Sequence, residues 1–340
     1  MSAASALRRG PSSTGSATAV EKSGVSAPSG RRDAIRNRLL DWYARHQRDL
    51  PWRRTRDPYA ILVSEVMLQQ TQVERVVPKY REFLARFPTF GALAAASRAE
   101  VIQCWVPLGY NRRAVRLQEL ARTVEQLGGL PERAEELVQL EGLGSYTAAA
   151  VACFAFGHQV PTIDTNVRRV LGRLLADELG GGEPTPRQLA EVARNILPVG
   201  RAEDWNQALM DLGATICTAR TPACQRCPAA DLCAGRPNLT GALEARQKRA
   251  AEARVPYSAG ERFEGSSRYY RGQIVRRLSA GSASELLALD DLGHAVRADY
   301  GPGQRPWLLE VLHRLERDGL VRTERTEAAA GDEELLVGLP

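Results

Sequence analysis

Four of the six cysteines lie in one short segment, "CTARTPACQRCPAADLC", with the spacing C-x6-C-x2-C-x5-C. Four thiolates this close together predict a metal site, either tetrahedral zinc or an iron–sulfur cluster. Zinc ribbons usually combine two C-x2-C pairs, whereas this segment has one, and its wider, unequal loops suit a bulkier group. We therefore expect a 4Fe–4S cluster with a structural role, held by Cys217, Cys224, Cys227 and Cys233.

Two carboxylates stand in sequence contexts that suggest further chemistry. Glu65, in "SEVMLQQTQ", continues an apolar stretch that is typical of a buried helix start. Asp164, in "PTIDTNVRRVLGRL", directly precedes a helical pattern, and Asn166 follows two positions later. A carboxylate at a helix start is a common N-cap, and one that also faces a groove stabilises a nearby cation. Glu65 is either a functional acid or a solvated residue on a helix face.

A glycine-containing turn lies upstream of Asp164. The stretch "LVQLEGLGSYTAAAVACFAFG" contains Leu140-x-Gly142-x-Gly144 between two helical segments, which is the helix–hairpin–helix pattern. Gly142 and Gly144 permit a tight turn, and the free amides at the start of the next helix bind a phosphate without reading base sequence. Many ordinary helix–helix turns have the same pattern, so it gains weight only from its neighbours.

The elements that must position these groups are predicted to be helical from Arg31 to about Ala234. In residues 31–47 the apolar side chains recur at helical spacing, and Pro51 ends the pattern. No alternation typical of a strand is visible in this part, so the expected fold class is all-α. Further helices are predicted at 58–69, 73–86, 98–105, 111–127, 134–140, 145–156, 164–176, 186–196 and 203–213.

The remainder of the chain is predicted to be a linker, residues 235–260, and a separate unit, residues 261–340. In that unit three helices ("SSRYYRGQIVRRLS", "SASELLALDDLG" and "RPWLLEVLHRLERDGL") precede two strands ("LVRTERT" and "EELLVGLP"), the order of a winged helix. Such a module is either an added DNA-binding domain or a small packing or protein-interaction domain. In the first case, the phosphate-contacting residues would be Arg305, His313, Arg314 and Arg317.

The 340 residues carry a net charge of +6, with a pI near 9.1, and the cations are mostly arginine. This suits a partner rich in phosphate, although base composition of the genome could produce the same bias. No apolar run approaches the length of a membrane span. Residues 1–30 lack the apolar core of a secretory signal and predict a disordered tail. We therefore expect a cytoplasmic, nucleoid-associated protein with reduced cysteines and no membrane partner.

Together the motifs resemble the endonuclease III-like superfamily of DNA glycosylases. The stretches "LPWRRTRDPYAILVSEVMLQQTQVERVVPKY", "LGYNRRA" and "DWNQALMDLGATICTARTPAC" are similar to its adenine-specific MutY branch. The resemblance implies a two-lobed helix–hairpin–helix fold with DNA in the cleft. Residues 51–164 would form a six-helix barrel, and residues 31–50 with 165–234 an iron–sulfur lobe. It also implies hydrolysis of the N-glycosidic bond of a base flipped out of the duplex.

The resemblance also implies roles for individual residues. Glu65 corresponds to the glutamate that protonates the leaving adenine, and Asp164 to the aspartate that stabilises the oxocarbenium-like sugar or briefly bonds to it. Asn166 is expected to orient Asp164. Tyr146 occupies the position at which strand-cleaving relatives carry a lysine nucleophile. The lysines of this chain lie elsewhere, at Lys22, Lys79 and Lys248, so a monofunctional glycosylase is implied.

Two loops match the parts of the family that enter the base stack. Tyr110 matches the aromatic wedge, and intercalation offsets part of the unstacking cost of base flipping. Pro107 and Asn111 depart from the family's "GGLGYY", because this chain has "VPLGYN", so contacts to the opposite base could differ. The second loop corresponds to Gln69, Gln70 and Thr71, and the resemblance implies that Gln70 lies close to the orphaned partner base.

The C-terminus departs further, because nothing in residues 261–340 resembles the NUDIX-like domain that reads 8-oxoguanine in the family. The leading interpretation is a monomeric enzyme that acts on double-stranded DNA containing a mismatch or an oxidised base, and that removes adenine opposite 8-oxoguanine or guanine. One alternative is a T·G or U·G mismatch glycosylase. Another is a non-catalytic, lesion-sensing DNA-binding protein.

Overall fold

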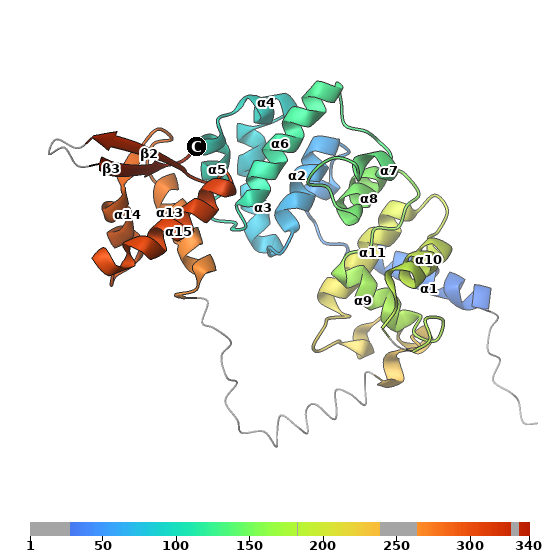
Figure 1. The fold of residues 1–340 in the computed structure, drawn as a ribbon. Coiled ribbons are helices and arrows are strands. Elements are labelled where there is room, and N and C mark those ends of the chain that lie inside the picture. The colour runs from blue at the N-terminus through green and yellow to red at the C-terminus, as the bar shows by residue number, and fades with distance from the viewer. Residues whose placement is uncertain (1–27, 182, 239–263, 328–332) are drawn as a thin grey trace, which may run out of the picture.

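The computed structural model describes residues 28–181, 183–238, 264–327 and 333–340 (Figure 1). The predicted tail and linker lie almost entirely outside these residues. Up to residue 238 the described elements are α1 Pro28–His46, η1 Pro51–Arg53, α2 Pro58–Leu68, α3 Val73–Arg86, α4 Phe90–Ala95, α5 Arg98–Trp105, α6 Arg112–Leu127, α7 Ala134–Leu137, α8 Ser145–Phe154, α9 Thr165–Leu174, α10 Pro186–Ile196, α11 Ala202–Thr215, η2 Cys224–Arg226 and η3 Ala230–Leu232.

The helices of this part agree closely with the sequence analysis, and its described residues contain no strand. The bounds predicted for α3, α5 and α10 match to the residue, because strong local signals mark the starts of two of them. Ser97 and Glu100 form a capping box on α5, and Thr185 and Gln188 form one on α10. Helix α4 was not predicted, since six residues are too few to show a helical period.

Helix α2 lies in the interior of the group formed by helices α2 to α8. The carboxylate of Asp57 caps its first turn by accepting from the amide of Tyr59 at 3.0 Å, and Pro58 suits the first helical position. Every residue from Tyr59 to Met67 is buried, and α2 packs against α3, α6 and α8. A polar side chain on this helix is therefore surrounded by protein.

Helix α1 lies with helices that come late in the sequence, as Figure 1 shows. It packs against α11, which packs against α9, and α9 in turn contacts α10. Helices α2 to α8 lie on the other side of α11. One group of helices therefore consists of α1, α9, α10 and α11, and the other consists of α2 to α8.

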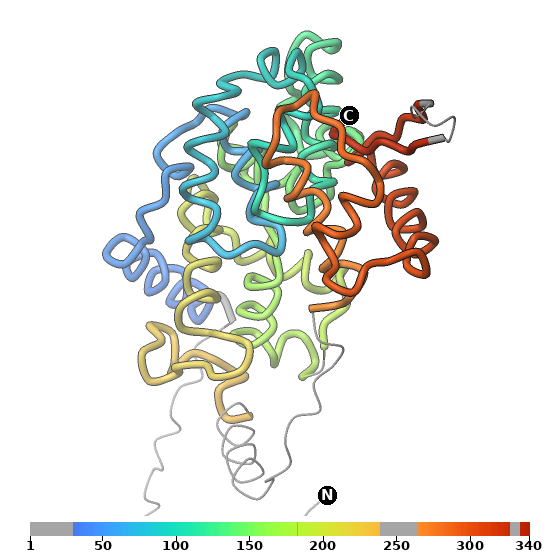
Figure 2. The backbone as a smooth tube through the Cα atoms, turned by 90° about the vertical axis from the view of Figure 1, so that its left-hand side faces the viewer, coloured from blue at the N-terminus to red at the C-terminus, as the bar shows by residue number. Residues whose placement is uncertain are grey.

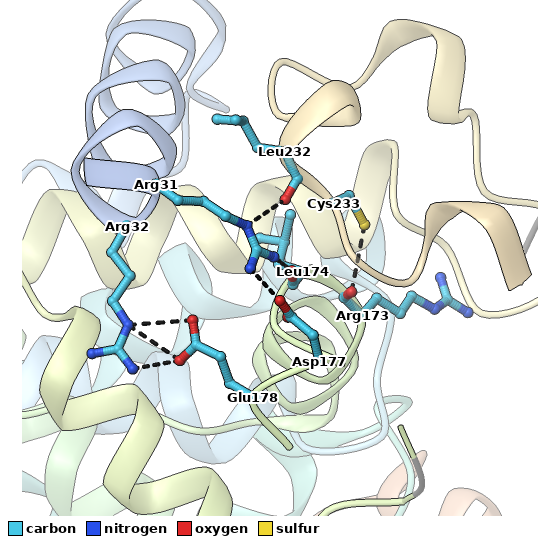
Figure 3. Close-up of polar contacts among 8 residues, drawn as sticks. All are labelled: Arg31, Arg32, Arg173, Leu174, Asp177, Glu178, Leu232 and Cys233. Atoms are coloured by element: carbon cyan, nitrogen blue, oxygen red, sulfur yellow. Dashed lines mark hydrogen bonds and ion pairs between the residues drawn. The ribbon is translucent and has the colours of Figure 1, made fainter. Parts of the chain in front are cut away.

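Two arginines at the start of α1 hold it to its late partners (Figure 3). Arg31 donates to the carbonyl of Leu232 at 3.0 Å and to that of Leu174 at 2.7 Å. Arg32 forms an ion pair with Glu178, just after α9. Backbone carbonyls at the end of α9 and beside Cys233 are therefore satisfied by α1, which fixes the position of the cysteine segment.

The C-terminal part combines three helices with a small antiparallel sheet of order β1-β3-β2. The predicted helix over residues 282–293 is wrong in its first half, because Leu286 to Ala288 pair with β3 as a strand and only then does α14 begin. Sheet pairing has overridden local helix propensity there. The predicted hairpin is confirmed. The elements are α13 Ser267–Ser279, β1 Leu286–Ala288, α14 Leu289–Val296, η4 Pro302–Gln304, α15 Arg305–Arg317, β2 Arg322–Glu327 and β3 Glu333–Gly338.

The C-terminal part, predicted as a separate unit, has a core that includes side chains of α5 and α6. Ala99, Ile102 and Val115 are buried in one apolar cluster with α13, α14 and α15. The amide of Gln103 also donates to the carbonyl of Gly281 at 3.0 Å. Figure 2 shows the orange and red segment lying against the cyan and green one. The sequence carried no sign of this contact, since Ile102 and Val115 look like ordinary core residues of their own helices.

Candidate active site

Glu65 lies in the middle of buried helix α2 and is only 6% exposed. Burial raises the pKa of its carboxyl to about 7, and the negative charge of Asp164 contributes in the same direction. A hydrogen bond from Tyr146 and the positive charge of Arg53 lower this pKa in part. Glu65 is therefore a carboxyl that is partly protonated near neutral pH, rather than the solvated helix-face residue of the simpler interpretation.

Tyr146 reaches Glu65 from the second residue of α8, directly after the glycine turn. Burial, together with the charges of Glu65 and Asp164, raises the pKa of the Tyr146 phenol well above its ordinary value. The side chain is therefore a neutral hydrogen-bond donor to Glu65. In this turn Gly142 is left-handed, with φ 89°, and no side chain caps α8 at Gly144. The first amides of α8 are thus left without a side-chain acceptor.

Asp164 is the N-cap of α9, and its carboxylate is held on both oxygens. One oxygen accepts from the amide of Val167 at 2.6 Å, and the other accepts from the side-chain amide of Asn166 at 2.9 Å. Asn166 is itself fixed, because its oxygen accepts from Arg169 at 2.6 Å. A Cβ on Gly213 would lie 2.6 Å from that of Asn166, so only glycine lets α11 approach this closely.

Glu65, Tyr146, Asp164 and Asn166 are thus brought together, although almost a hundred positions separate the two carboxylates in the sequence. The charge of Asp164 acts on both Glu65 and Tyr146. The two acids differ in environment: Glu65 is buried with one hydrogen bond from Tyr146, and Asp164 accepts two hydrogen bonds at the start of α9. Such a pair suits a proton donor next to a carboxylate that stabilises positive charge.

The two loops predicted to contact DNA contain the left-handed non-glycine residues of the described chain, Gln70 (φ 55°) and Tyr110 (φ 48°). This conformation is unfavourable for a residue with a Cβ and concentrates at functional sites. The side chains of Gln69 and Gln70 are exposed, Thr71 is half-buried, and Tyr110 is 45% exposed. Both loops therefore present their tips outward, one directly after α2 and the other between α5 and α6.

The four clustered cysteines line one cavity of about 20 Å³. Burial raises the pKa of the Cys227 thiol to about 11 and also raises that of Cys233, and Arg173 lies 3.3 Å from the sulfur of Cys217. Among the described residues, no three side chains of His, Cys, Asp or Glu lie close enough together to hold a single metal ion. Four thiols that line one cavity are the donor set that iron–sulfur clusters use.

Comparison with known proteins identifies the family. Residues 63–198 match the model described as the HhH-GPD superfamily base excision DNA repair protein. The chain is also 42% identical over 259 residues to the adenine DNA glycosylase of Mycobacterium tuberculosis (strain CDC 1551 / Oshkosh), an alignment that covers 74% of this chain and 80% of that relative. The chain belongs to the MutY-type branch of the HhH-GPD superfamily.

The chain is also similar to proteins named as thymine-DNA glycosylases. The thymine-DNA glycosylase of Aeropyrum pernix is 41% identical over 211 residues, which cover 60% of this chain and 95% of that protein. A solved structure of a thermostable thymine-DNA glycosylase superposes with a TM-score of 0.59 at 33% identity, covering 62% of this chain and 98% of the other. The helix–hairpin–helix fold predicted from sequence is therefore confirmed, and the protein is mostly helical.

Arg113 is a residue of this MutY-type chain that the sequence analysis left without a role. Its guanidinium donates to the carbonyls of Val66 (2.8 Å) and Gly109 (3.1 Å) and to the hydroxyl of Thr71 (3.0 Å). It also lies 5.5 Å from the ring centre of Tyr110. Burial lowers its pKa to about 10. Arg113 thus joins the end of α2 to both outward loops. Its partners are mainly backbone carbonyls, which leave no signal in a sequence.

Asp211 is the second residue that the sequence did not reveal. It is fully buried on α11 and accepts from the Nε of Arg48 at 2.7 Å and from both terminal nitrogens of Arg53 at 2.8 Å. Burial alone would raise the pKa of Asp211, but the hydrogen bonds and charge of Arg53 lower it overall. Because Arg53 also acts on Glu65, this network connects α11 with the active site.

The charged residues predicted on α15 lie outside both sites. Arg305 forms an ion pair with Asp290 at 3.0 Å, and Arg314 forms one with Glu310. His313 and Arg317 are exposed on the same helix. Among the described residues, no helix is both long and apolar enough to cross a bilayer.

Proposed function

We propose that the protein is a monofunctional adenine DNA glycosylase of base excision repair, which hydrolyses the N-glycosidic bond of adenine mispaired with 8-oxoguanine or guanine. The proposal depends on one observation: Glu65, with a pKa of about 7, lies beside Tyr146 and Asp164. The family description and the adenine DNA glycosylase relatives support it. The substrate is double-stranded DNA, from which the adenine must be extruded to reach a buried acid.

In this mechanism Glu65 donates its proton to the leaving adenine. A purine leaves poorly as an anion, so a donor with a pKa near the working pH lowers the barrier. Asp164 stabilises the positive charge that develops on the deoxyribose, and Asn166 keeps its carboxylate in one orientation. Tyr146 orients the Glu65 carboxyl by hydrogen bonding. Water then completes the hydrolysis.

The monofunctional assignment is supported by the side chains around Glu65. Tyr146, a phenol, stands where a strand-cleaving enzyme needs an amine to form a Schiff base. Lys79 is the one lysine among the described residues, and its ammonium donates to Glu82 at 2.9 Å and to the carbonyl of Cys104 at 3.2 Å. It belongs to α3 and does not contact the carboxylate pair.

The cysteine cavity supports a 4Fe–4S cluster, which when bound ties residues 217–233 into one rigid segment. Arg173 would stabilise the negative charge at Cys217 through its guanidinium. With α1, α9, α10 and α11 this segment would form the iron–sulfur lobe, and residues 51–164 would form the barrel. In the C-terminal part, the order of helices and strands supports a winged-helix module.

The thymine-DNA glycosylase relatives favour a second candidate function, the removal of thymine or uracil from T·G or U·G mismatches. A pyrimidine leaves with less need of ring protonation, so the raised pKa of Glu65 favours adenine. The test is base release from duplexes carrying A·8-oxoguanine, A·G, T·G or U·G, read after alkali. We expect release from the first two and no strand cleavage before alkali. Release from T·G and U·G alone would establish the alternative, and cleavage before alkali would contradict the monofunctional assignment.

The pH dependence of base release should report the ionisation of Glu65. Because the protonated form is the donor, the single-turnover rate should fall as the pH rises through about 7. The hydrogen bond from Tyr146 lowers the Glu65 pKa, so Tyr146→Phe should move this midpoint upward, by roughly one pH unit. Tyr80→Phe, which alters a buried tyrosine of α3, is the control and should leave the midpoint in place. A midpoint that moves downward in Tyr146→Phe would contradict this account.

Loss of one cluster ligand should be visible without any activity measurement. In Cys227→Ser we expect iron and acid-labile sulfide per chain to fall to near zero, together with a lower melting temperature, because metal binding contributes to folding. Cys104→Ser, which changes a half-buried cysteine far from the cavity, should retain wild-type iron content. Zinc in place of iron in the purified wild-type protein would overturn the cluster assignment.

A further inference from the structure

A groove of about 790 Å³ runs between the outward loops and the C-terminal helix α13. Gln70 and Tyr110 line it on one side, and Arg268, Tyr269 and Gln273 of α13 line it on the other. Glu65, Tyr146 and Asp164 are not part of its lining, so the groove is distinct from the catalytic residues. It begins at the loop that directly follows the catalytic helix α2.

The lining of this groove suits a polyanion. Every charged side chain that lines it among the described residues is an arginine, on α3, α6 or α13. Arg116 and Arg276 are exposed and make no ion pair with a described residue. Tyr110 and Tyr269 add aromatic surface between the guanidinium groups. Clustered arginines neutralise backbone phosphates, and aromatic side chains beside them can stack on an unpaired base.

Several contacts fix α13 in place beside the loops. Arg268 donates to the hydroxyl of Tyr110 at 3.2 Å, and its guanidinium lies 5.9 Å from the ring centre of that tyrosine. Asp318 pairs with Arg271 of α13 and, at 3.4 Å, with Arg112 of α6. Because the two sides also share an apolar core, the groove is a built feature of the fold rather than a gap between independent domains.

We propose that this groove binds the phosphate backbone of the substrate duplex next to the mispair, and that Arg268 and Arg276 of α13 contact the phosphates. The inference depends on the proposed function only in naming the ligand as the repaired duplex. It differs from the expectation that α15 docks on DNA, because the charged side chains of α15 do not line the groove. In this arrangement the C-terminal part enlarges the DNA-binding surface that the Gln70 and Tyr110 loops form.

The test is the affinity of full-length Arg268→Ala and Arg276→Ala for 30-base-pair duplexes, with and without an A·8-oxoguanine mispair, as a function of KCl concentration. Each variant should bind both duplexes about tenfold more weakly, and its salt dependence should decrease by about one phosphate contact. Arg314→Ala, which changes a paired arginine of α15, is the matched control and should bind like the wild type. Tyr110 is contacted from α13 by Arg268 rather than by Arg276, so Arg276→Ala also tests the groove without disturbing the wedge.

Two results would overturn the inference: wild-type affinity in both α13 variants, or equal weakening in Arg314→Ala. Base release by the wild-type protein from the same duplexes tests the proposed function separately. If the wild type releases adenine but the α13 variants bind normally, the groove has another ligand. If the variants lose affinity although the wild type releases no base, the groove binds DNA and the proposed reaction is wrong.

Discussion

Glu65→Gln is expected to reduce the single-turnover rate of adenine release by about 10²- to 10⁴-fold, the usual contribution of a positioned general acid. Glutamine has the same shape and can still accept a hydrogen bond from Tyr146, but it has no proton to give at pH 7. Replacing a buried, partly ionised carboxyl with a neutral amide also removes a desolvation cost, so the fold should remain intact.

The test compares the rate of adenine release with the affinity for DNA in the same variant. Glu65→Gln should keep wild-type affinity for an A·8-oxoguanine duplex and an unchanged melting temperature. Glu74→Gln, an exposed acid at the start of α3, is the control and should release adenine at the wild-type rate. A variant that loses base release and DNA binding together would assign Glu65 a structural role. One that retains full activity would leave a non-catalytic, DNA-binding protein as the better description.

Asp211→Ala is expected to destabilise the protein by about 3–5 kcal/mol, the largest stability effect that we predict for one substitution. It removes the carboxylate that neutralises Arg53, whose side chain is 8% exposed, and so leaves a buried guanidinium without its partner. Chemical denaturation at pH 7 would measure the loss. The control is Asp49→Ala, which breaks an exposed pair with Arg54 and should cost less than about 1 kcal/mol.

The sign of the pH effect follows from the lowered pKa of Asp211. A carboxyl whose pKa is lower in the folded state stabilises the fold above its unfolded pKa, near 3.9, and loses that contribution as the pH falls. The wild-type advantage over Asp211→Ala should therefore be complete at pH 7 and shrink progressively below about pH 4. An advantage that grows on acidification would show that the carboxylate is not held by the arginines.

The sequence revealed the residues that carry the chemistry of the site, but not the residues that hold them in place. Glu65, Asp164 and the cysteine spacing were visible because an acid in an apolar run and four close thiols are unusual in themselves. Arg113 and Asp211 were not visible, because an arginine that binds carbonyls and an acid that pairs across 163 positions look like any other charged residue. The packing of α13 against α5 was hidden for a related reason: apolar periodicity shows that a helix face is buried, not what covers it.

The position of α1 has a consequence for synthesis of the chain. Arg31 donates to the carbonyl of Leu232, which lies 201 residues further along the chain. Helix α1 therefore leaves the ribosome long before the residues that it packs against have been made. Helices α2 to α8 contain their own near-neighbour contacts and can collapse first, whereas α1 must wait and then dock last. During that interval the apolar side of α1, with Leu39 and Tyr43, is exposed in the nascent chain. We therefore expect truncations before α11, which begins at Ala202, to yield a chain that aggregates through its first helix.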